Sequence, residues 1–169
     1  RDMLENAGQT FQTTMDSEII VNLISRSRKP TVEERIIDSV KEIDGAYSLV
    51  LMTKEKMYGA RDPHGFRPLC IGRTATGGYV LASETCALDA LGAAFVRDVK
   101  PGEFIEIGEN GLKSVLFTHA ARKQVCSFEY IYFARPDSSI DGQDVYQARL
   151  NMGREMWNET RYEADLVIS

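Results

Sequence analysis

The sequence is poor in the residues that build disulfide frameworks and zinc sites. Its three cysteines are Cys70, Cys86 and Cys126. Because they are far apart and odd in number, we do not expect a secreted disulfide scaffold. They indicate instead a protein of the reducing cytosol. The two histidines are His64 and His119, and no Cys-x-x-Cys pair is present. A zinc site made wholly within this chain is therefore not expected.

An excess of basic charge and a long apolar run are also missing. The chain has 20 Lys and Arg residues against 25 Asp and Glu residues, a formal net charge of −5. Neither nucleic acid nor an anionic membrane is therefore an expected partner. No apolar run approaches ~20 residues, so no segment is expected to span a bilayer. The 169 residues are 43% apolar, which is enough for a compact domain with a sizeable core.

Both ends of the sequence predict that the chain is a fragment of a longer one. Residues 1–6 have the character of the last turn of a helix. Residues 164–169 have the character of a buried strand without the loop that would follow it. Targeting signals therefore cannot be judged from this sequence.

Two amphipathic helices are predicted near the beginning of the chain. The first covers residues 16–28, with Asp16 or Ser17 placed to cap it. The second begins at Thr31, because Thr31 and Glu34 have the spacing of a capping box. The apolar positions at helical spacing are Ile19, Ile20, Leu23 and Ile24 in the first helix and Val32, Ile36, Ile37, Val40 and Ile43 in the second.

A region rich in strands is predicted next. The first strand, 46–52, is apolar on both faces, which is typical of a sheet covered on both sides. Turns at 62–65 and 76–78 punctuate the region. Helices followed by a mostly antiparallel meander predict one half of a layered α+β sandwich. The remaining elements are strands over 57–61, 68–72, 79–83, 96–99, 103–107 and 112–117 and a short helix over 84–91.

The last third of the chain predicts the opening of a second, α/β domain. The polar and irregular segment 118–127 is interpreted as a domain edge, which gives the predicted domains 1–125 and 126–169. Beyond that edge the sequence predicts a strand over 128–133, a turn over 135–138, a helix over roughly 143–161 and a final strand over 164–169.

Three motifs together resemble one family. The first, Asp-Pro-His-Gly-Phe-Arg-Pro-Leu at 62–69, resembles the hairpin of class II glutamine amidotransferases. The second, Ala-Ser-Glu-Thr at 82–85 followed by Ala87-Leu88, resembles the strand-to-helix signature after that hairpin. The third and most specific is Cys-Ser-Phe-Glu-Tyr-Ile-Tyr-Phe-Ala-Arg-Pro-Asp-Ser at 126–138, extended by 146–153. It resembles the junction between the glutaminase and phosphoribosyltransferase domains of amidophosphoribosyltransferases.

The resemblance implies a fold and a two-site enzyme. The fold is α+β: the C-terminal half of an N-terminal-nucleophile αββα glutaminase sandwich over 1–125, then the first elements of an α/β phosphoribosyltransferase domain. At the first site, an N-terminal cysteine attacks the side-chain amide of glutamine and releases glutamate. At the second site, the ammonia displaces pyrophosphate from 5-phosphoribosyl diphosphate and gives 5-phosphoribosylamine, which opens purine biosynthesis.

The resemblance also implies cofactors and partners. It implies Mg²⁺ at the phosphoribosyl site and, in some members, a [4Fe-4S] cluster. It implies purine nucleotides as feedback inhibitors and a homo-oligomer. The implied location is the cytoplasm, or the plastid if the source is a plant.

Both catalytic centres are expected to lie outside this chain, so no catalytic residue is predicted within it. No cysteine precedes Cys70, so the nucleophile, the oxyanion-hole Asn-Gly pair and the arginine for the glutamine carboxylate would lie upstream. Asn110-Gly111 is interpreted as a hairpin turn. The sugar-phosphate loop would lie beyond Ser169. We therefore expect the fragment by itself to be inactive.

Asp16 is the leading candidate for a substrate contact. The resemblance places it where a carboxylate holds the α-ammonium of glutamine, and a fixed carboxylate suits a small cationic amine. The alternative is a plain helix cap. Both roles can coexist, because the two carboxylate oxygens offer several acceptor sites.

Cys126 and Tyr146 are two further candidates for a functional role, and each has a structural alternative. In members with a cluster, the position of Cys126 supplies one thiolate to the iron. The alternative for Cys126 is a buried thiol beside Phe128 and Tyr130. Tyr146 is a candidate for lining the ammonia path, and its alternative is an aromatic residue packed at helical spacing with Leu150.

The other reactive residue types are assigned structural roles. Cys70 and Cys86 are predicted to be small core residues. His64 and His119 are predicted to be solvated loop residues. Two arginines that precede prolines, Arg67 and Arg135, are expected to anchor loops to backbone carbonyls, without a catalytic role.

Two other functions remain open from the sequence. One is a glutaminase piece of an asparagine synthetase, since that family has a similar hairpin. The segment 126–138 argues against it, because it should lead into a phosphoribosyltransferase domain. The other is a non-catalytic binding module that has lost its nucleophile.

Overall fold

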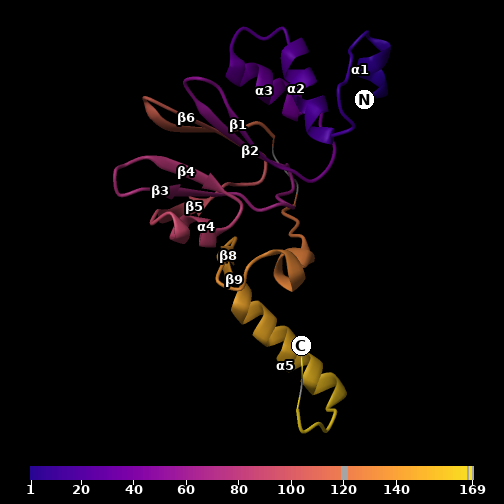
Figure 1. Ribbon diagram of the computed structural model, residues 1–169, viewed down its shortest axis with the longest axis vertical. Helices are drawn as coiled ribbons and strands as arrows, with labels where there is room; N and C mark the ends of the chain where they lie inside the picture. Colours follow the sequence, from indigo (N-terminus) through magenta and orange to yellow (C-terminus); the bar gives the residue numbers. More distant parts are fainter. Residues whose placement is uncertain (119–121, 167, 169) are drawn as a thin grey trace. The chain divides into compact units, whose positions relative to one another are not determined.

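The structure is a computed structural model that describes residues 1–118, 122–166 and 168. Helices and antiparallel sheets occur together (Figure 1), so the predicted α+β class is confirmed. By their contacts the residues form two compact units. The first contains Arg1–Gly65 and Lys100–Lys123, and the second contains Phe66–Val99 and Gln124–Ser169. No helix in the described part of the chain is both long and apolar enough to cross a membrane.

The first unit begins with three helices, α1 (Asp2–Asn6), α2 (Asp16–Arg26) and α3 (Val32–Val40). The predicted capping box of α3 is confirmed: the Thr31 hydroxyl accepts from the Glu34 amide at 3.2 Å, and the Glu34 carboxylate accepts from the Thr31 amide at 3.2 Å. The predicted cap of α2 is wrong. Met15 occupies the capping position without a side-chain bond, because Asp16 is already the first helical residue.

The first sheet has the strand order β1-β2-β6-β7, with every pair antiparallel. Its strands are β1 (Ser48–Met52), β2 (Met57–Arg61), β6 (Glu103–Gly108) and β7 (Gly111–Leu116). Helix α3 buries its apolar stripe against this sheet. The core consists of Ile36, Val40, Tyr47, Tyr58, Ala60, Phe104 and Phe117.

Strand β1 differs from its prediction, because the described residues cover only one of its faces. Leu49 and Leu51 pack against the helix-side core. Val50 and Met52 point to the other face, where 50% and 77% of their surfaces are exposed. Side chains alternate along a strand, so a continuous apolar run does not by itself show that both faces are buried.

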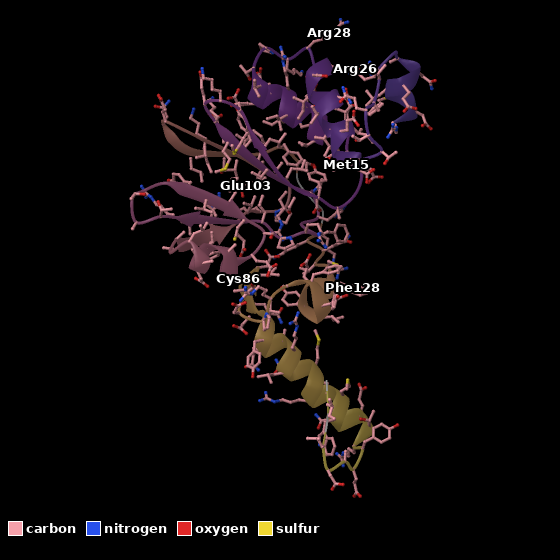
Figure 2. All side chains as sticks on the ribbon, viewed as in Figure 1. Met15, Arg26, Arg28, Cys86, Glu103 and Phe128 are labelled. Carbon is pink, nitrogen blue, oxygen red and sulfur yellow. The ribbon has the colours of Figure 1, made fainter. Side chains whose placement is uncertain are left out.

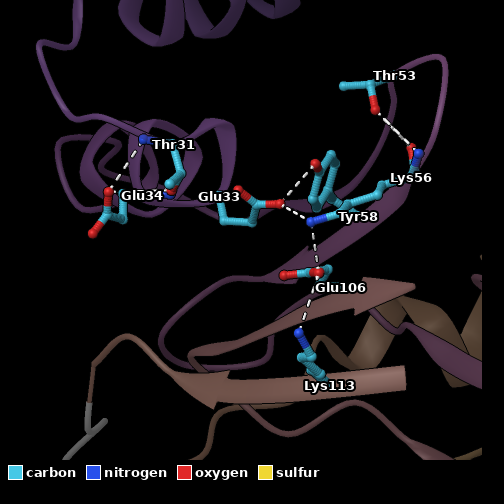
Figure 3. Close-up of polar contacts among 8 residues, drawn as sticks. All are labelled: Thr31, Glu33, Glu34, Thr53, Lys56, Tyr58, Glu106 and Lys113. Atoms are coloured by element: carbon cyan, nitrogen blue, oxygen red, sulfur yellow. Dashed lines mark hydrogen bonds and ion pairs between the residues drawn. The ribbon is translucent and has the colours of Figure 1, made fainter. Parts of the chain in front are cut away.

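A charged network ties α3 to the sheet (Figure 3). Lys56, which precedes β2, pairs with Glu33 of α3 and, at 2.9 Å, with Glu106 of β6. The Tyr58 hydroxyl donates to Glu33 at 3.2 Å, and the Lys113 ammonium lies 3.9 Å from Glu106. The hydrogen bond from Lys56 lowers the pKa of Glu33 to about 2.

The second unit contains a sheet of order β4-β3-β5, again antiparallel. The predicted strands therefore form two separate sheets rather than one meander. Leu88 is buried so closely over β3 that a Cβ at Gly72 would lie 2.6 Å from its methyl group. The elements are β3 (Cys70–Arg73), β4 (Tyr79–Ala82), α4 (Thr85–Ala90) and β5 (Ala94–Asp98).

The last part of the second unit departs most from prediction. The segment predicted as a strand over 128–133 is a π-helix, η1 (Glu129–Phe133), closed by the Ala134 amide donating to the Glu129 carbonyl at 3.0 Å. A small hairpin of β8 (Ser139–Ile140) and β9 (Gln143–Asp144) follows it. Helix α5 (Val145–Thr160) is confirmed, capped by the Asp144 carboxylate.

The predicted final strand over 164–169 is not found in its described residues. Leu166 and Ile168 are 74% and 85% exposed, and Val167 and Ser169 lie outside the described residues. A strand needs a neighbouring strand for its backbone hydrogen bonds, and no described residue pairs with this segment. The expected strand–helix–strand opening of an α/β domain is therefore present only as its helix.

Candidate functional site

The loop before α2 is held by one carboxylate, that of Glu18. It accepts the Gln12 amide at 2.7 Å, the Thr13 amide at 2.8 Å and the Thr13 hydroxyl at 2.6 Å. These bonds lower the pKa of Glu18, with the Thr13 hydroxyl as the largest cause. The Met15 amide in turn donates to Thr13 at 3.2 Å. The loop therefore enters α2 in a defined geometry.

Asp16 projects from the first turn of α2, next to Met15, which Figure 2 labels at that end of the helix. Its side chain is exposed. No hydrogen bond or ion pair joins it to the residues that the structure describes. Because the carboxylate of Glu18 accepts the loop amides, the Asp16 carboxylate is left available to a cation from outside. The alternative of a helix cap is therefore wrong for Asp16.

The hairpin motif begins beside two consecutive charged residues that are both buried. Arg61 and Asp62 are 1% and 0% exposed. The Arg61 guanidinium donates to the Gly65 carbonyl at 2.9 Å, and the Asp62 carboxylate accepts the His64 amide at 2.9 Å. Gly65 has φ +70, and a Cβ there would lie 2.7 Å from Pro101. The predicted turn is confirmed, and its internal bonds give it a rigid shape.

The π-helix η1 is held by arginines on two sides. The Arg67 Nη1 atom lies 2.8 Å from Glu129 Oε1, and the same guanidinium lies 5.1 Å from the centre of the Phe133 ring. Arg149 of α5 donates to the carbonyls of Tyr130 and Ala134, each at 2.7 Å. These bonds satisfy carbonyls that a helix end leaves without partners. They explain why an aromatic, β-branched run forms a helical turn and not a strand.

A second carboxylate, Glu84, fixes the turn that follows η1. It accepts the Arg135 amide at 2.8 Å and the Ser138 hydroxyl at 2.9 Å. The neighbouring Thr85 hydroxyl accepts the Ser139 amide at 2.8 Å. Two of the three motifs singled out in the sequence, 82–85 and 126–138, are thus in direct contact.

Cys126 and Tyr146 both lie in the second unit. Cys126 is half-buried just before η1, where Phe128 is labelled in Figure 2, and its carbonyl accepts the Glu129 amide at 3.1 Å. Tyr146 is 57% exposed and lines a groove along α5 with Leu150 and Trp157. Among the described residues, no three potential metal ligands gather in one place.

The remaining reactive residues have mixed outcomes. Cys70 is a core residue, as predicted, and burial raises the pKa of its thiol to about 12. Cys86 was also predicted in the core but is half-buried in α4, where its thiol donates to Glu84 at 3.7 Å. His64 is partly buried, with Nδ1 3.4 Å from the Arg122 carbonyl, and His119 lies outside the described residues.

The two arginines before prolines bind carboxylates as well as shaping loops. Arg67 pairs with Glu129, as described above. Arg135 donates to both oxygens of Asp137, at 3.0 and 2.8 Å, in an exposed pair. Anchoring to backbone carbonyls was the prediction. The partners described for both arginines are acidic side chains within reach of each guanidinium.

A family profile described as a glutamine amidotransferase domain matches residues 1–90. The chain belongs to this glutamine amidotransferase family. The profile covers the loop with Asp16, the hairpin at 62–65 and the Glu84 segment. The predicted α+β glutaminase fold is confirmed by the same match together with the structural likeness below.

The relatives of this glutamine amidotransferase carry a more specific name. It is 46% identical over 167 residues to the amidophosphoribosyltransferase of Bacillus subtilis (strain 168), which is 99% of this chain and 35% of that protein. It is 42% identical over 168 residues to the amidophosphoribosyltransferase of Staphylococcus aureus (strain N315), covering 99% of this chain and 34% of the relative. The chain thus spans about a third of the length of these relatives.

Two solved structures agree with it closely. One is the glutamine phosphoribosylpyrophosphate (PRPP) amidotransferase of B. subtilis complexed with ADP and GMP, with a TM-score of 0.93, 46% identity, and coverage of 97% of this chain and 36% of that one. The other is described as the allosteric regulatory enzyme of purine biosynthesis, also with a TM-score of 0.93 and 46% identity, covering 97% of this chain and 35% of that one.

Sequence reasoning missed three carboxylates that organise these sites: Glu18, Glu84 and Glu129. Glu18 stands three residues after Met15, the spacing at which a glutamate often serves a helix start. The acidic and hydroxyl side chains of Asp16 and Ser17 obscure that signal, because both are favoured cap residues. Glu129 interrupts a run of aromatic residues, and a buried acid in such a run requires a cationic partner.

Proposed function

We propose that the longer protein containing this chain is an amidophosphoribosyltransferase. It would transfer ammonia from glutamine to 5-phosphoribosyl diphosphate and give 5-phosphoribosylamine, pyrophosphate and glutamate, the first committed step of purine biosynthesis. The observation that carries the proposal is the 46% identity to the B. subtilis enzyme over 99% of this chain. Because a match over 167 of the 169 residues extends well past residue 126, it favours this function over an asparagine synthetase.

In this proposal Asp16 binds the α-ammonium of glutamine. Its support is the geometry of the loop: Glu18 accepts the loop amides, while Asp16 is exposed at the start of α2 without a partner among the described residues. A charge-assisted bond from the ammonium to this carboxylate would fix the orientation of the substrate. Tyr146, at the start of α5, is proposed to line the ammonia path.

The proposed cofactors belong to the longer protein. Mg²⁺ would serve the phosphoribosyl site, and a [4Fe-4S] cluster would take Cys126 as one of its ligands. A cluster of this kind requires four ligands, usually cysteine thiolates. The described residues near Cys126 do not provide such a set. No step of the reaction is therefore assigned to either group here.

Nucleotides are proposed as regulators and not as substrates. A B. subtilis relative with 46% identity was solved with ADP and GMP. We propose that purine nucleotides likewise inhibit the protein that contains this chain, that it is a cytoplasmic homo-oligomer, and that it binds neither nucleic acid nor membranes.

The test is an assay of the full-length protein with two nitrogen sources. With 5-phosphoribosyl diphosphate present, both glutamine and ammonia should give pyrophosphate, and glutamine should also give an equal amount of glutamate. Release of glutamate that depends on ATP and aspartate would indicate an asparagine synthetase. Glutamine binding without release of glutamate would indicate the non-catalytic module.

A further inference from the structure

One ion pair connects the hairpin motif to the junction motif. Arg67 follows the turn at 62–65 by two residues, and Glu129 opens η1. Their charged atoms lie 2.8 Å apart. The guanidinium also faces the Phe133 ring at 5.1 Å. Glu129 and Phe133 lie about one turn apart on η1, so one arginine contacts two residues on the same side of this helix.

The carboxylate of this pair is buried. Glu129 is 3% exposed, whereas the Arg67 side chain is 43% exposed. Glu129 Oε1 accepts no well-aligned hydrogen bond within the described residues, so its compensation there is the charge of Arg67. A buried ion pair contributes little net stability compared with apolar packing, yet losing one partner leaves a costly unpaired charge. The pair therefore constrains geometry more than it increases stability.

Further hydrogen bonds hold the rest of the junction. Arg149 binds the carbonyls of η1 from α5, and Glu84 binds the turn after η1. Burial raises the pKa of Glu129, the charge of Arg67 opposes this, and the charge of Glu84 adds to the rise. Arg67 thus joins the segment beside the hairpin turn to the first helix of the junction through its side chain.

We propose that Arg67 and Glu129 are positioning residues that couple the two reactions, so that ammonia released from glutamine is used for synthesis and not lost to water. This inference rests on the proposed function. Its physical basis is that Arg67, which follows the hairpin turn in the chain, contacts both Glu129 and Phe133 of η1, and neither residue of the ion pair need touch a substrate. Residues that connect two sites in this way typically change their coupling by 0.5–2 kcal/mol, which is about twofold to thirtyfold.

The experiment measures glutamate released and phosphoribosylamine formed in the same reaction of the full-length protein. Glu129→Gln should lower the ratio of phosphoribosylamine to glutamate by about twofold to thirtyfold. Its ammonia-dependent synthesis should remain close to that of the unchanged protein. Arg67→Met should behave alike, and Arg67→Lys, which retains the charge, should keep more of the coupling. The matched control is Asp137→Asn, which removes an acid from the exposed pair with Arg135 and should leave the ratio unchanged.

A ratio that stays the same in Glu129→Gln and Arg67→Met would overturn the proposal, even if both variants were less stable. If the single variants fail to fold, the double variant Arg67→Met/Glu129→Met is measured, because it leaves no buried charge unpaired; an unchanged ratio there would overturn the proposal equally. The proposed function is judged separately, from pyrophosphate release by the unchanged protein with glutamine and with ammonia.

Discussion

At the scale of single residues, Asp16 and its neighbour Glu18 show how two acids in one turn of helix differ in role. Glu18 accepts three hydrogen bonds from the loop before α2. Asp16 is exposed and has no partner in the part of the chain that the structure describes. The difference arises because Gln12 and Thr13 bind the carboxylate of Glu18 and not that of Asp16.

Replacing Asp16 with alanine in the full-length protein should impair glutamine-dependent synthesis far more than ammonia-dependent synthesis. Loss of a charge-assisted bond to the ammonium should cost about 2–4 kcal/mol, or roughly 30- to 1,000-fold in kcat/KM for glutamine. Ammonia does not use this bond. The matched control is Asp2→Ala, which removes the carboxylate from the first residue of another helix, α1. Equal losses with both nitrogen sources would assign Asp16 to structure alone.

Gly102 is a position where an added methyl group should be destabilising. It has φ +68, and a Cβ there would lie 2.7 Å from the Thr118 carbonyl oxygen. Gly102→Ala should lower the free energy of unfolding by at least about 2 kcal/mol, from backbone strain and the clash together. The control is Gly92→Ala, with φ +62 but nothing within 4 Å, which should cost about 1 kcal/mol. Thermal denaturation of both variants tests this, and equal costs would contradict it.

At the scale of secondary-structure elements, the link between α3 and the first sheet should depend on pH. Lys56 holds the pKa of Glu33 at about 2, below its ordinary value of 4.5. A carboxylate with a lowered pKa stabilises the fold above its unfolded pKa, and this contribution is lost as the pH falls from about 4.5 to about 2. The advantage of the unchanged protein over Glu33→Gln should therefore be about 1 kcal/mol near neutral pH.

That advantage should disappear in acid, and high salt should reduce it, because the partly exposed pair is screened. Chemical denaturation at several pH values measures it. If the difference between Glu33→Gln and the unchanged protein were constant from neutral to acid pH, the network would not be electrostatic in origin.

The π-helix η1 should depend on Arg149. Arg149→Leu removes two hydrogen bonds to the carbonyls of Tyr130 and Ala134. Local opening of η1 should become easier by about 1–3 kcal/mol, which corresponds to amide exchange roughly 5- to 150-fold faster in a peptide covering 126–138. Arg154→Leu is the control: it lies on the same helix and bonds only Asn151, at 3.4 Å, among the interactions described. Similar exchange in both variants would contradict the role of Arg149.

At the scale of the whole molecule, the 169-residue polypeptide should release no glutamate from glutamine. The family reaction uses a cysteine with a free α-amine, and Cys70, Cys86 and Cys126 each follow another residue through a peptide bond. Cys70 is in addition buried, with its pKa raised to about 12, so almost none of it is thiolate near neutral pH. Glutamate above the background of a triple Cys→Ala variant would contradict this.

Local signals predicted most of the secondary structure. The capping box of Thr31 and Glu34, the strand at 57–61 and the turn at 62–65 were correct because short-range bonds determine them. The predicted division at 125/126 stays a prediction. The contacts instead group 66–99 with 124–169, because Arg67, Glu84 and Thr85 bind the later segment.

The sequence by itself determined the family, the helices and turns, and Asp16 as the residue to examine, because motifs and hydrophobic periodicity are written in neighbouring positions. Tertiary structure decided what depends on distant partners. The run at 128–133 has the composition of a strand but folds as a π-helix. Arg67 binds Glu129 from 62 positions away, and Arg149 binds the carbonyls of Tyr130 and Ala134 from 19 and 15 positions away. Likewise, only the folded loop shows that Glu18, and not Asp16, binds Gln12 and Thr13. A charge pair between distant residues leaves no periodic trace in the sequence, so only the folded chain reveals it.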